Sequence, residues 1–342
     1  MLPVLLALAL LLAACGGAAS APPSSSPRAS APAASDPGTL TKLNVSYSAL
    51  SATSAPEWVA KGAGFFQKQG LDVSLPFLSP ATLTAGLIGG SVDIGFGSPG
   101  SVAAAVSQGG DLTIIGATYE GSTFTIVARP EIKSVPELKG KKVAATQRGA
   151  TTDFLIRRVA QQQGWGPNDV NVVYIPEQAN MVPALTSGAV DAAVMTEPLT
   201  SVALSQGTHA IFGPDTPGAN EFISMSVVVV KRGFIPAHRD ALKRFLMANI
   251  EAVHLIKTNP DEAAKHVGAY LKVDDPKVLR SSLVGVQKVL RDDFSLTMPG
   301  LQSVIDNTAV ADPEIAKVRP QDLVDLSLVD EIRASHFIER LK

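Results

Sequence analysis

Side chains that could perform catalysis or bind a metal ion are few and scattered in this sequence. The five histidines fall mostly in predicted helices late in the chain and show no metal-ligand spacing; they are His209, His238, His254, His266 and His336. No G-x-S-x-G motif or phosphate-binding P-loop occurs, and the single cysteine lies near the N-terminus. The sequence therefore predicts no enzyme, no cofactor and no metal site, and favours a protein that holds a small molecule without transforming it.

Small and polar residues instead gather where predicted strands end. In open α/β sheets, ligands bind outside the carboxyl ends of the strands, often at helix N-termini. We therefore expect ligand contacts from several such strand ends. The candidates are Ser48, Thr53, Ser54, Gly97, Ser98, Pro99, Tyr119, Glu120, Arg148, Gly149, Ala150, Thr151, Thr196 and Glu197. Tyr47 and Trp58 could stack on a ligand ring, but packing in the core is favoured.

Residues 95–100 (GFGSPG) match the G-x-G-x-x-G pattern of dinucleotide-binding loops. They follow a predicted strand and open a predicted helix. Two observations disfavour a dinucleotide site, because the unit does not open the domain and the corresponding residues 194–198 of an internal repeat lack the glycines. We expect instead that the backbone amides of this loop and Ser98 face a ligand cleft, with a plain tight turn as the alternative.

Arg148 and Glu197 are the charged candidates at the ends of strands in the second half of the internal repeat. Arg148 could bind a carboxylate or sulfonate, or it could be a solvated surface residue. Beside it, Gly149 allows close approach of backbone to ligand, and one of the hydroxyls of Thr151 and Thr152 is expected to cap the next helix. Glu197 suits a ligand with an amine or another donor, or it is a helix N-terminal residue stabilised by the helix dipole. The mixed signs favour a zwitterion or a polar neutral molecule over a bare inorganic anion.

Strands and helices alternate from Leu40 onward. The predicted strands cover residues 43–47, 71–77, 92–96 and 112–119, and the predicted helices between them cover residues 55–70, 81–90 and 101–109. This alternation implies crossover connections and a mostly parallel sheet. After Gly233 the apolar spacing is that of helices, which we expect at residues 236–258, 276–291, 299–310 and 320–333.

An internal repeat relates residues 81–109 to residues 179–207 without gaps, at a separation of 98 residues. The repeat predicts two similar lobes, each a mostly parallel sheet flanked by helices, which enclose one cleft and close about a hinge. We expect crossover segments at 123–132 and 221–232. Lobe 1 is predicted to contain residues 40–128 and 226–342, with the C-terminal helices packed on it, and lobe 2 residues 129–225.

The N-terminal run Leu2–Ala14 has the length of a signal-peptide apolar region and is too short to span a bilayer. It ends in Leu12-Ala13-Ala14-Cys15, which resembles a bacterial lipobox and predicts that residues 1–15 are a lipoprotein signal with Cys15 as the lipidation site. The run lacks a preceding Lys or Arg. The alternatives are an ordinary signal peptide with an incidental cysteine and a buried helix.

Residues 16–38 are rich in Ala, Ser, Pro and Gly and are predicted to be a disordered tether. With Cys15 lipidated, no thiol is left for a disulfide. A net charge of −2 and an aromatic content of 5% exclude the basic, stacking surface of a nucleic-acid-binding protein. The protein is thus expected outside the cytoplasm, anchored to the bacterial cell membrane.

Several stretches resemble the periplasmic solute-binding proteins of ABC importers for nitrate, sulfonate, taurine and thiamine-pyrimidine precursors. They are residues 59–73, 89–93, 134–144, 185–191 with Glu197-Pro198, and 319–325. The resemblance implies a two-lobed periplasmic-binding-protein-like fold. It also implies a monomer that delivers a sulfonate-, taurine- or pyrimidine-like molecule to an ABC permease and its ATPase. A ligand-sensing receptor, and an enzyme similar to thiamine-pyrimidine synthases, are the alternatives.

Overall fold

The computed structural model describes residues 40–147, 150–166, 168–217, 219, 224–309 and 312–341. The chain divides into two units, residues 1–39 and residues 40–342, and the described residues belong to the second. Cys15, the predicted tether, Arg148 and Gly149 lie outside the described residues.

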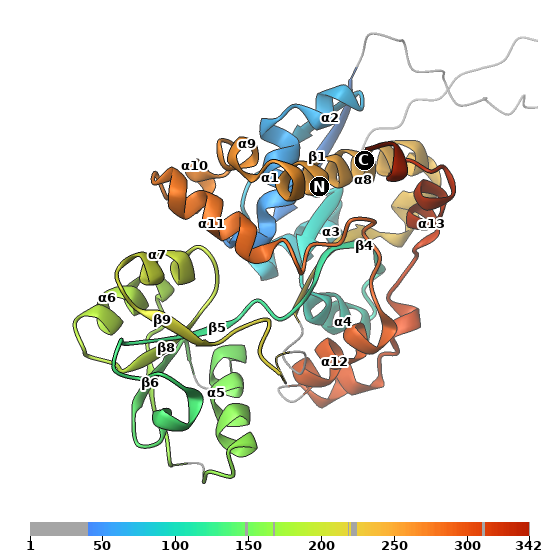
Figure 1. Cartoon of the computed structure of the whole chain (residues 1–342). Helices are drawn as coiled ribbons and strands as arrows, with labels where there is room; N and C mark the ends of the chain where they lie inside the picture. The colour runs from blue at the N-terminus through green and yellow to red at the C-terminus, as the bar shows by residue number, and fades with distance from the viewer. Residues whose placement is uncertain are drawn as a thin grey trace, which may run out of the picture. The chain divides into compact units, whose positions relative to one another are not determined.

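Two five-stranded sheets form the centre of the second unit (Figure 1). The first has the order β2-β1-β3-β10-β4 and consists of β1 (Thr41–Tyr47), β2 (Leu71–Ser74), β3 (Ile94–Gly97), β4 (Leu112–Gly121) and β10 (Ser224–Lys231). The second has the order β7-β6-β8-β5-β9 and consists of β5 (Thr125–Ala128), β6 (Lys142–Ala145), β7 (Asn171–Tyr174), β8 (Ala192–Met195) and β9 (His209–Phe212).

Each sheet contains one reversed strand. In the first sheet, β1 is parallel to β2 and β3, whereas β10 is antiparallel to β3 and β4. In the second, β6 is parallel to β7 and β8, whereas β5 is antiparallel to β8 and β9. The other strands of each sheet therefore run in one direction, which confirms the mostly parallel sheets expected from the sequence.

The chain passes from one sheet to the other twice, between β4 and β5 and between β9 and β10. The predicted lobe boundary at residue 128 gives β5 to lobe 1, but β5 is hydrogen-bonded to β8 and β9 in the second sheet. Residues 224 and 225, predicted in lobe 2, belong to β10 of the first sheet. An apolar strand sequence does not reveal which sheet it joins, so the first boundary gave the whole of β5 to the wrong lobe and the second divided β10. The lobe ranges otherwise stay a prediction.

Helices flank both sheets. The α-helices are α1 (Ala55–Gly62), α2 (Phe65–Lys68), α3 (Pro80–Gly89), α4 (Pro99–Ser107), α5 (Thr151–Gln162), α6 (Met181–Thr186), α7 (Leu199–Ser205), α8 (Ile235–Thr258), α9 (Pro260–Ala264), α10 (Gly268–Leu271), α11 (Pro276–Val286), α12 (Met298–Ala309) and α13 (Ser327–Ala334). Short 3₁₀ helices cover Ala52–Ser54, Val135–Leu138, Gln178–Asn180, Arg232–Phe234, Pro313–Lys317, Pro320–Asp322 and Glu339–Leu341.

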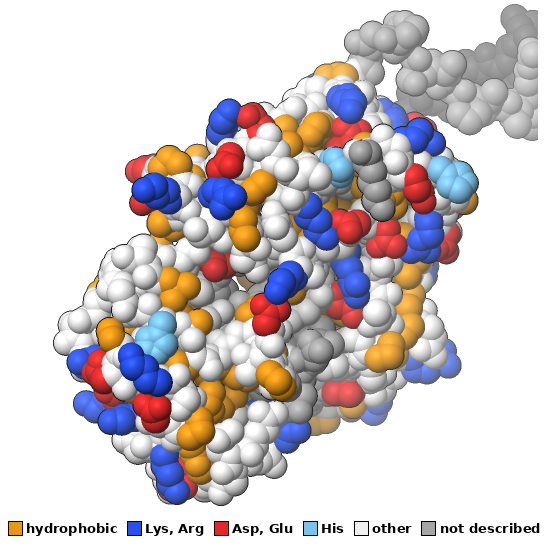
Figure 2. All heavy atoms as spheres, in the orientation of Figure 1, with side chains coloured by type: hydrophobic (Ala, Val, Ile, Leu, Met, Phe, Trp, Pro, Cys, Tyr) orange, Lys and Arg blue, Asp and Glu red, His pale blue; other side chains and the backbone are white. Residues whose placement is uncertain are grey.

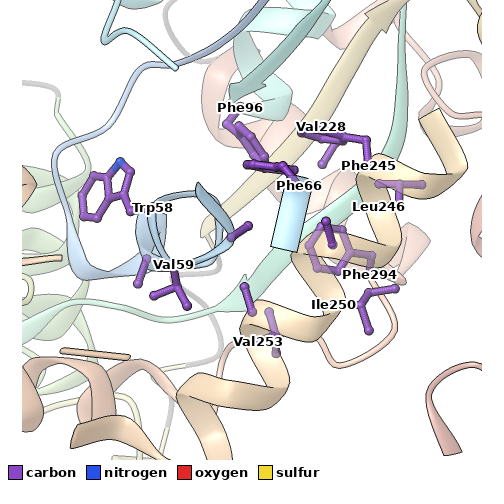
Figure 3. Close-up of a cluster of buried hydrophobic side chains, with 14 of the residues drawn as sticks. Trp58, Val59, Phe66, Phe96, Val228, Phe245, Leu246, Ile250, Val253 and Phe294 are labelled. Atoms are coloured by element: carbon purple, nitrogen blue, oxygen red, sulfur yellow. The ribbon is translucent and has the colours of Figure 1, made fainter. Parts of the chain in front are cut away.

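The long helix α8 supplies one wall of the largest hydrophobic cluster. Its buried residues Phe245, Leu246, Ile250 and Val253 recur at helical spacing and share this cluster with side chains of α1, α2 and β3 (Figure 3). Phe245 stacks on Phe66 of α2 with ring centroids 5.3 Å apart. This packing fixes α1 and the loop before it against the first sheet.

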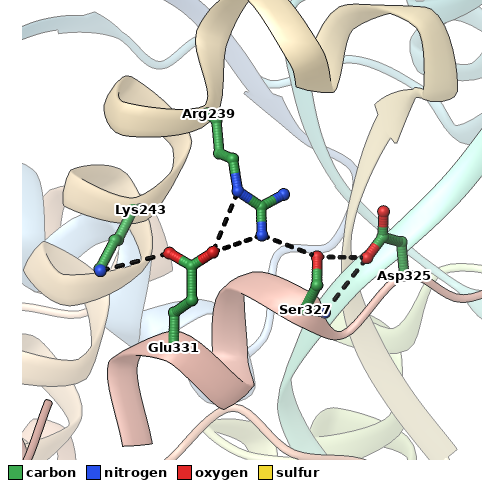
Figure 4. A network of polar contacts seen from close by, with 5 residues as sticks. All are labelled: Arg239, Lys243, Asp325, Ser327 and Glu331. Carbon is green, nitrogen blue, oxygen red and sulfur yellow. Dashed lines mark hydrogen bonds and ion pairs between the residues drawn. The ribbon is translucent and has the colours of Figure 1, made fainter. Parts of the chain in front are cut away.

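A polar network fastens α13 to α8 (Figure 4). The Arg239 guanidinium donates to the Glu331 carboxylate and, at 3.1 Å, to the Ser327 hydroxyl. Lys243 donates to the second oxygen of Glu331 at 3.3 Å, and the Ser327 hydroxyl donates to Asp325 at 2.6 Å. Together with α12, which packs on α4 and β10, α13 covers the first sheet, as the sequence predicted for the C-terminal helices.

The internal repeat has the same strand register in both sheets. Val45 pairs with Ile94 between β1 and β3, and 98 residues later Val143 pairs with Ala192 between β6 and β8. The turn before the later strand of each pair contains a glycine with φ of 79° (Gly90) or 78° (Gly188), a conformation that favours glycine.

Candidate functional site

The loop after β1 carries three of the predicted contacts. The Ser48 hydroxyl donates to the Phe96 carbonyl at 3.1 Å, which ties this loop to the end of β3. Thr53 and Ser54 are buried, at 4% and 3% exposure, and the Ser54 hydroxyl donates to the Ala49 carbonyl at 3.1 Å. Ser54 is the N-cap residue of α1 but makes no capping hydrogen bond with its side chain. Thr53 and Ser54 thus hold the loop in shape, and Ser48 is the more accessible hydroxyl.

The loop after β3 ends at the N-terminus of α4. Ser98 is the exposed N-cap residue, and its hydroxyl oxygen accepts from the Ser101 backbone N–H at 3.2 Å. Pro99 is buried at the first helical position, whereas a Cβ added at Gly97 would meet no atom closer than 3.6 Å. The structure therefore leaves the backbone at Gly97 and the Ser98 hydroxyl accessible at a helix N-terminus, where acceptor groups bind well.

The corresponding loop of the second sheet lies between β6 and α5. The N-cap residue of α5 is Ala150, so the expectation that a threonine caps this helix was wrong. The Thr152 hydroxyl is used elsewhere, because it lies 2.8 Å from the Thr146 hydroxyl and accepts from the Thr146 backbone N–H at 3.0 Å. Thr151 is exposed at the first turn.

Glu197 follows β8 and connects the loop after this strand, in the second sheet, to the loop after β1 in the first sheet. Its backbone carbonyl accepts from the Ala52 N–H and from the Ser51 hydroxyl, both at 3.2 Å. Its carboxylate accepts from the Ser201 N–H at 3.1 Å and so caps α7, as the helix-N-terminal alternative proposed. Burial raises the pKa of Glu197, and hydrogen bonds from Ser201 and Ser282 lower it in part. Its neighbour Thr196 is half-buried at the same strand end.

Glu120 has a different environment from the one expected. Its side chain is 5% exposed and accepts from the Arg291 guanidinium at 2.6 Å, from the Thr297 N–H at 2.9 Å and from the Thr297 hydroxyl. The carboxylate thus holds the segment after α11 against β4. These partners occupy both oxygens, so we remove Glu120 from the ligand contacts.

Tyr119 lies at the end of the same strand, and burial raises the pKa of its phenol. Hydrogen bonds to Ser224 and Thr53 lower that pKa in part, so the hydroxyl lies between the loop after β1 and the crossover strand β10. Tyr47 and Trp58 are buried and meet edge to face at 5.5 Å, which confirms core packing over ligand stacking for both.

Sequence reasoning missed Glu57 in the first turn of α1. It is 0% exposed, and neither carboxyl oxygen has a hydrogen-bond partner of normal geometry among the described residues. Burial raises its pKa well above the usual value, and the N–H of Glu57 and the Ser54 hydroxyl lower it only in part. The Ser54-x-x-Glu57 spacing is that of a capping box, which normally places the glutamate at the surface, so no sequence signal marked its burial.

No group of three or more His, Cys, Asp or Glu among the described residues could hold a metal ion. Within that same part of the chain, none of the helices is both long and apolar enough to cross a membrane.

Two mostly parallel sheets, each with one reversed crossover strand, and small polar loops at their strand ends define the two-lobed fold of periplasmic binding proteins. The chain belongs to the NMT1/THI5-like family, whose pattern matches residues 51–263. The structure is similar to that of the periplasmic aliphatic sulphonate binding protein SsuA from Escherichia coli. The TM-score is 0.67 at 20% sequence identity, covering 85% of this chain and 100% of that one.

Two proteins of similar sequence are also named as binding proteins. A candidate binding protein of Brucella abortus (strain 2308) is 25% identical over 250 residues, which cover 71% of this chain and 75% of that protein. The taurine-binding periplasmic protein of Escherichia coli (strain K12) is 26% identical over 216 residues, which cover 62% of this chain and 67% of that protein. These are binding proteins, in agreement with the prediction that the chain is not an enzyme.

Proposed function

We propose that this protein is an extracytoplasmic solute-binding protein that captures a small organic molecule between its two sheets and delivers it to an ABC importer. The molecule is a sulfonate-, taurine- or pyrimidine-like compound. The contacts come from Ser48, Gly97, Ser98 and Tyr119 on the first-sheet side, and from Arg148, Gly149, Ala150, Thr151 and Thr196 on the second.

The observation that carries this proposal is the contact of Glu197 with Ser51 and Ala52. It brings the loop after β8 of the second sheet onto the loop after β1 of the first, through two hydrogen bonds of 3.2 Å. Because each loop directly follows a parallel strand, the strand ends that bind ligands in open sheets face one another here. A molecule bound between them contacts both sheets at once and stabilises their closed arrangement.

A thermal-shift panel tests the proposal and identifies the ligand. The panel contains taurine, butanesulfonate, nitrate, an aromatic carboxylate and aminopyrimidines, with a divalent metal salt and a nucleotide cofactor as comparison compounds. A cognate compound at about 100 times its dissociation constant adds roughly 2.7 kcal/mol to the free energy of unfolding. A protein that responds only to a metal ion or a nucleotide cofactor contradicts the proposal.

A matched pair of variants places the binding site. Ser98→Ala removes an exposed hydroxyl at the N-terminus of α4, and we expect it to weaken the binding of the identified compound. Ser205→Ala removes a hydroxyl that only donates to the Val202 carbonyl at 2.7 Å at the far end of α7, and it leaves binding unchanged. Equal affinities of both variants and the parent protein remove the α4 terminus from the site.

We further propose that a lipid on Cys15 anchors the protein to the membrane, which places its binding domain beside the permease. Cells that express the protein and its Cys15→Ser variant are labelled with a fatty-acid analogue and fractionated. We expect label and membrane association for the parent protein and neither for the variant. Label that persists in the variant, or that is absent from both, contradicts the anchor.

A further inference from the structure

Leu50 lies in the loop after β1, between two contacts that tie this loop to different sheets. On one side, the Ser48 hydroxyl donates to the Phe96 carbonyl in the first sheet at 3.1 Å. On the other side, the Ser51 hydroxyl donates to the Glu197 carbonyl at the end of a second-sheet strand, at 3.2 Å. Glu197 also lines the recess that Figure 2 shows where the parts of the molecule with the two sheets meet. Leu50 is 51% exposed, so an apolar side chain is accessible beside this junction.

Phe77 brings a second exposed apolar side chain to the same end of the first sheet. Beyond the end of β2, backbone hydrogen bonds join Pro76 and Leu78 to Tyr47, at 3.4 and 3.0 Å. Phe77 therefore lies beside Tyr47, the residue before Ser48. The rings of Phe77 and Tyr47 meet at 66° with their centroids 5.7 Å apart, and Phe77 is 44% exposed. The Phe77 ring is thus packed on one side and leaves surface for a further aromatic ring.

The loops at this end of the first sheet contain no ionisable side chain. Strands β2, β1 and β3 are neighbours and run parallel, so their carboxyl ends lie at one edge of the sheet. The residues that follow these strands, 48–54, 75–79 and 98, are all hydroxyl-bearing, small or apolar. A charged group placed against them would lose water without gaining a partner of opposite charge. The part of a ligand that contacts these loops is therefore expected to be uncharged and largely hydrocarbon.

We propose that the site between the two sheets takes a molecule with an aromatic hydrocarbon ring and one anionic acceptor group, and that Leu50 and Phe77 determine this preference. The ligand class concerns the site of the proposed function and rests on that function. The ring lies against Leu50 and Phe77. The acceptor group meets the accessible backbone of Gly97 and the Ser98 hydroxyl at the N-terminus of α4. A rigid ring loses less conformational freedom on binding than an alkyl chain, and aromatic pairs contribute more than their buried area alone.

The test compares matched sulfonates on the full chain. The probe is benzenesulfonate, and the comparison compounds are ethanesulfonate, which lacks the ring, and cyclohexanesulfonate, whose ring has no aromatic face. We expect calorimetry to give binding of benzenesulfonate about tenfold or more tighter than that of ethanesulfonate, with cyclohexanesulfonate between the two. Equal affinities for benzenesulfonate and ethanesulfonate overturn the apolar contacts. Equal affinities for benzenesulfonate and cyclohexanesulfonate overturn the choice of an aromatic ring.

Failure of this ligand class and failure of the proposed function give different results. If taurine, nitrate or an aminopyrimidine binds and benzenesulfonate does not, the aromatic ligand class is refuted while the protein remains a solute-binding protein. If neither these sulfonates nor any small molecule of the thermal-shift panel binds, the proposed function is contradicted and the ligand class falls with it.

Variants then locate the ring. Leu50→Ala and Phe77→Ala each weaken benzenesulfonate binding about tenfold and leave ethanesulfonate binding unchanged, because only the ring contacts these side chains. Leu40→Ala is the matched control, since Leu40 is 42% exposed and directly precedes β1, at the opposite end of the strand that leads to Leu50. We expect it to bind both compounds like the parent protein. Unaltered affinity for benzenesulfonate in the Leu50 and Phe77 variants, or equal losses for both compounds, overturns their role in specificity.

A measurement on the parent protein decides if a variant is poorly folded. Phe77 packs on the Tyr47 ring, so its removal also alters the core beside the site. In the parent protein saturated with benzenesulfonate, we expect intermolecular nuclear Overhauser effects from the ligand ring protons to the Leu50 methyl groups and the Phe77 ring. Effects that connect the ligand only to other side chains overturn the placement.

Discussion

The carboxylate of Asp191 accepts a hydrogen bond of 2.8 Å from the backbone N–H of Lys142. In the first sheet, 98 residues earlier, the carboxylate of Asp93 accepts from the Asn44 N–H at 2.7 Å. Each aspartate thus joins the start of its own strand to the neighbouring strand that precedes it in the chain. The repeat visible in the sequence is therefore a repeat of one tertiary contact, which fixes the register of β1 with β3 and of β6 with β8.

Because the two aspartates make equivalent hydrogen bonds, removing either one should lower the free energy of unfolding by a similar amount. Asp93→Ala and Asp191→Ala should each lower the free energy of unfolding by about 1–2 kcal/mol, because each removes a hydrogen bond to a charged group that is partly exposed. Urea denaturation measures both. The exposed Asp274 serves as control, and its alanine variant should stay within about 0.5 kcal/mol of the parent protein. A large difference between the two aspartate variants would show that the two sheets do not depend on this contact alike.

Glu120 is predicted to act in stability and not in ligand binding. Its side chain is 5% exposed and paired with Arg291, so Glu120→Gln should cost about 2 kcal/mol, as for a lost hydrogen bond to a carboxylate with little access to water. The matched change Glu314→Gln breaks an exposed pair with Lys317 and should cost less than about 0.5 kcal/mol. Denaturation measures both values, and calorimetry with the identified ligand should give unchanged affinity for both variants. Weakened binding in Glu120→Gln alone would return Glu120 to the site.

Glu57 is predicted to make the protein less stable as the pH rises. Burial raises its pKa in the folded state above the unfolded value, so the folded state binds the proton more tightly. Its contribution is therefore complete below the usual glutamate pKa and is lost as the pH rises through the raised pKa. Glu57→Gln should match the parent protein in acid and be more stable than it at neutral pH, as measured by urea denaturation across a pH series.

Glu137 serves as a control for Glu57, because its pKa is shifted in the opposite direction. The pKa of Glu137 is lowered because its carboxylate accepts from the Lys133 N–H and the Ser134 hydroxyl. Stability from that group is present above the usual glutamate pKa and is lost as the pH falls through the lowered one. Glu137→Gln should therefore be less stable than the parent protein at neutral pH, with the difference vanishing in acid. The same sign in both variants would contradict the burial argument for Glu57.

The sequence predicted those features that depend on local pattern and repetition. The strands, the helix over 236–258 and the equivalence of Asp93 with Asp191 follow from periodicity and from the ungapped repeat. The partners of single polar side chains could not be predicted. Glu120 is paired with Arg291, a residue 171 positions later, and which residue reaches a strand end depends on how distant helices pack.

In the candidate site too, the positions of polar residues could be predicted from the sequence, whereas their hydrogen-bond partners could not. The sequence indicated that polar residues collect at the strand ends, and the structure has Ser98 at a helix N-terminus there. It did not indicate that Thr152 is bonded to Thr146, which leaves Ala150 as the N-cap, because a threonine at a helix start is compatible with both arrangements.

Substitution by alanine at two helix-terminal glycines should change the free energy of unfolding in opposite directions. A Cβ at Gly62, the last residue of α1, would lie 2.8 Å from the Cβ of His266, an atom that moves only if the backbone of that residue moves. Gly62→Ala should therefore lower the free energy of unfolding by about 1–3 kcal/mol, the range for overpacking. A Cβ at Gly89, the last residue of α3, would meet no atom within 4 Å, and Gly89→Ala should raise stability by about 0.4–1 kcal/mol because alanine restricts the unfolded chain. Urea denaturation of the two variants checks both signs. If Gly62→Ala also stabilised the protein, the close approach of His266 to the end of α1 would be refuted, since the helix propensity of alanine is the same at both positions.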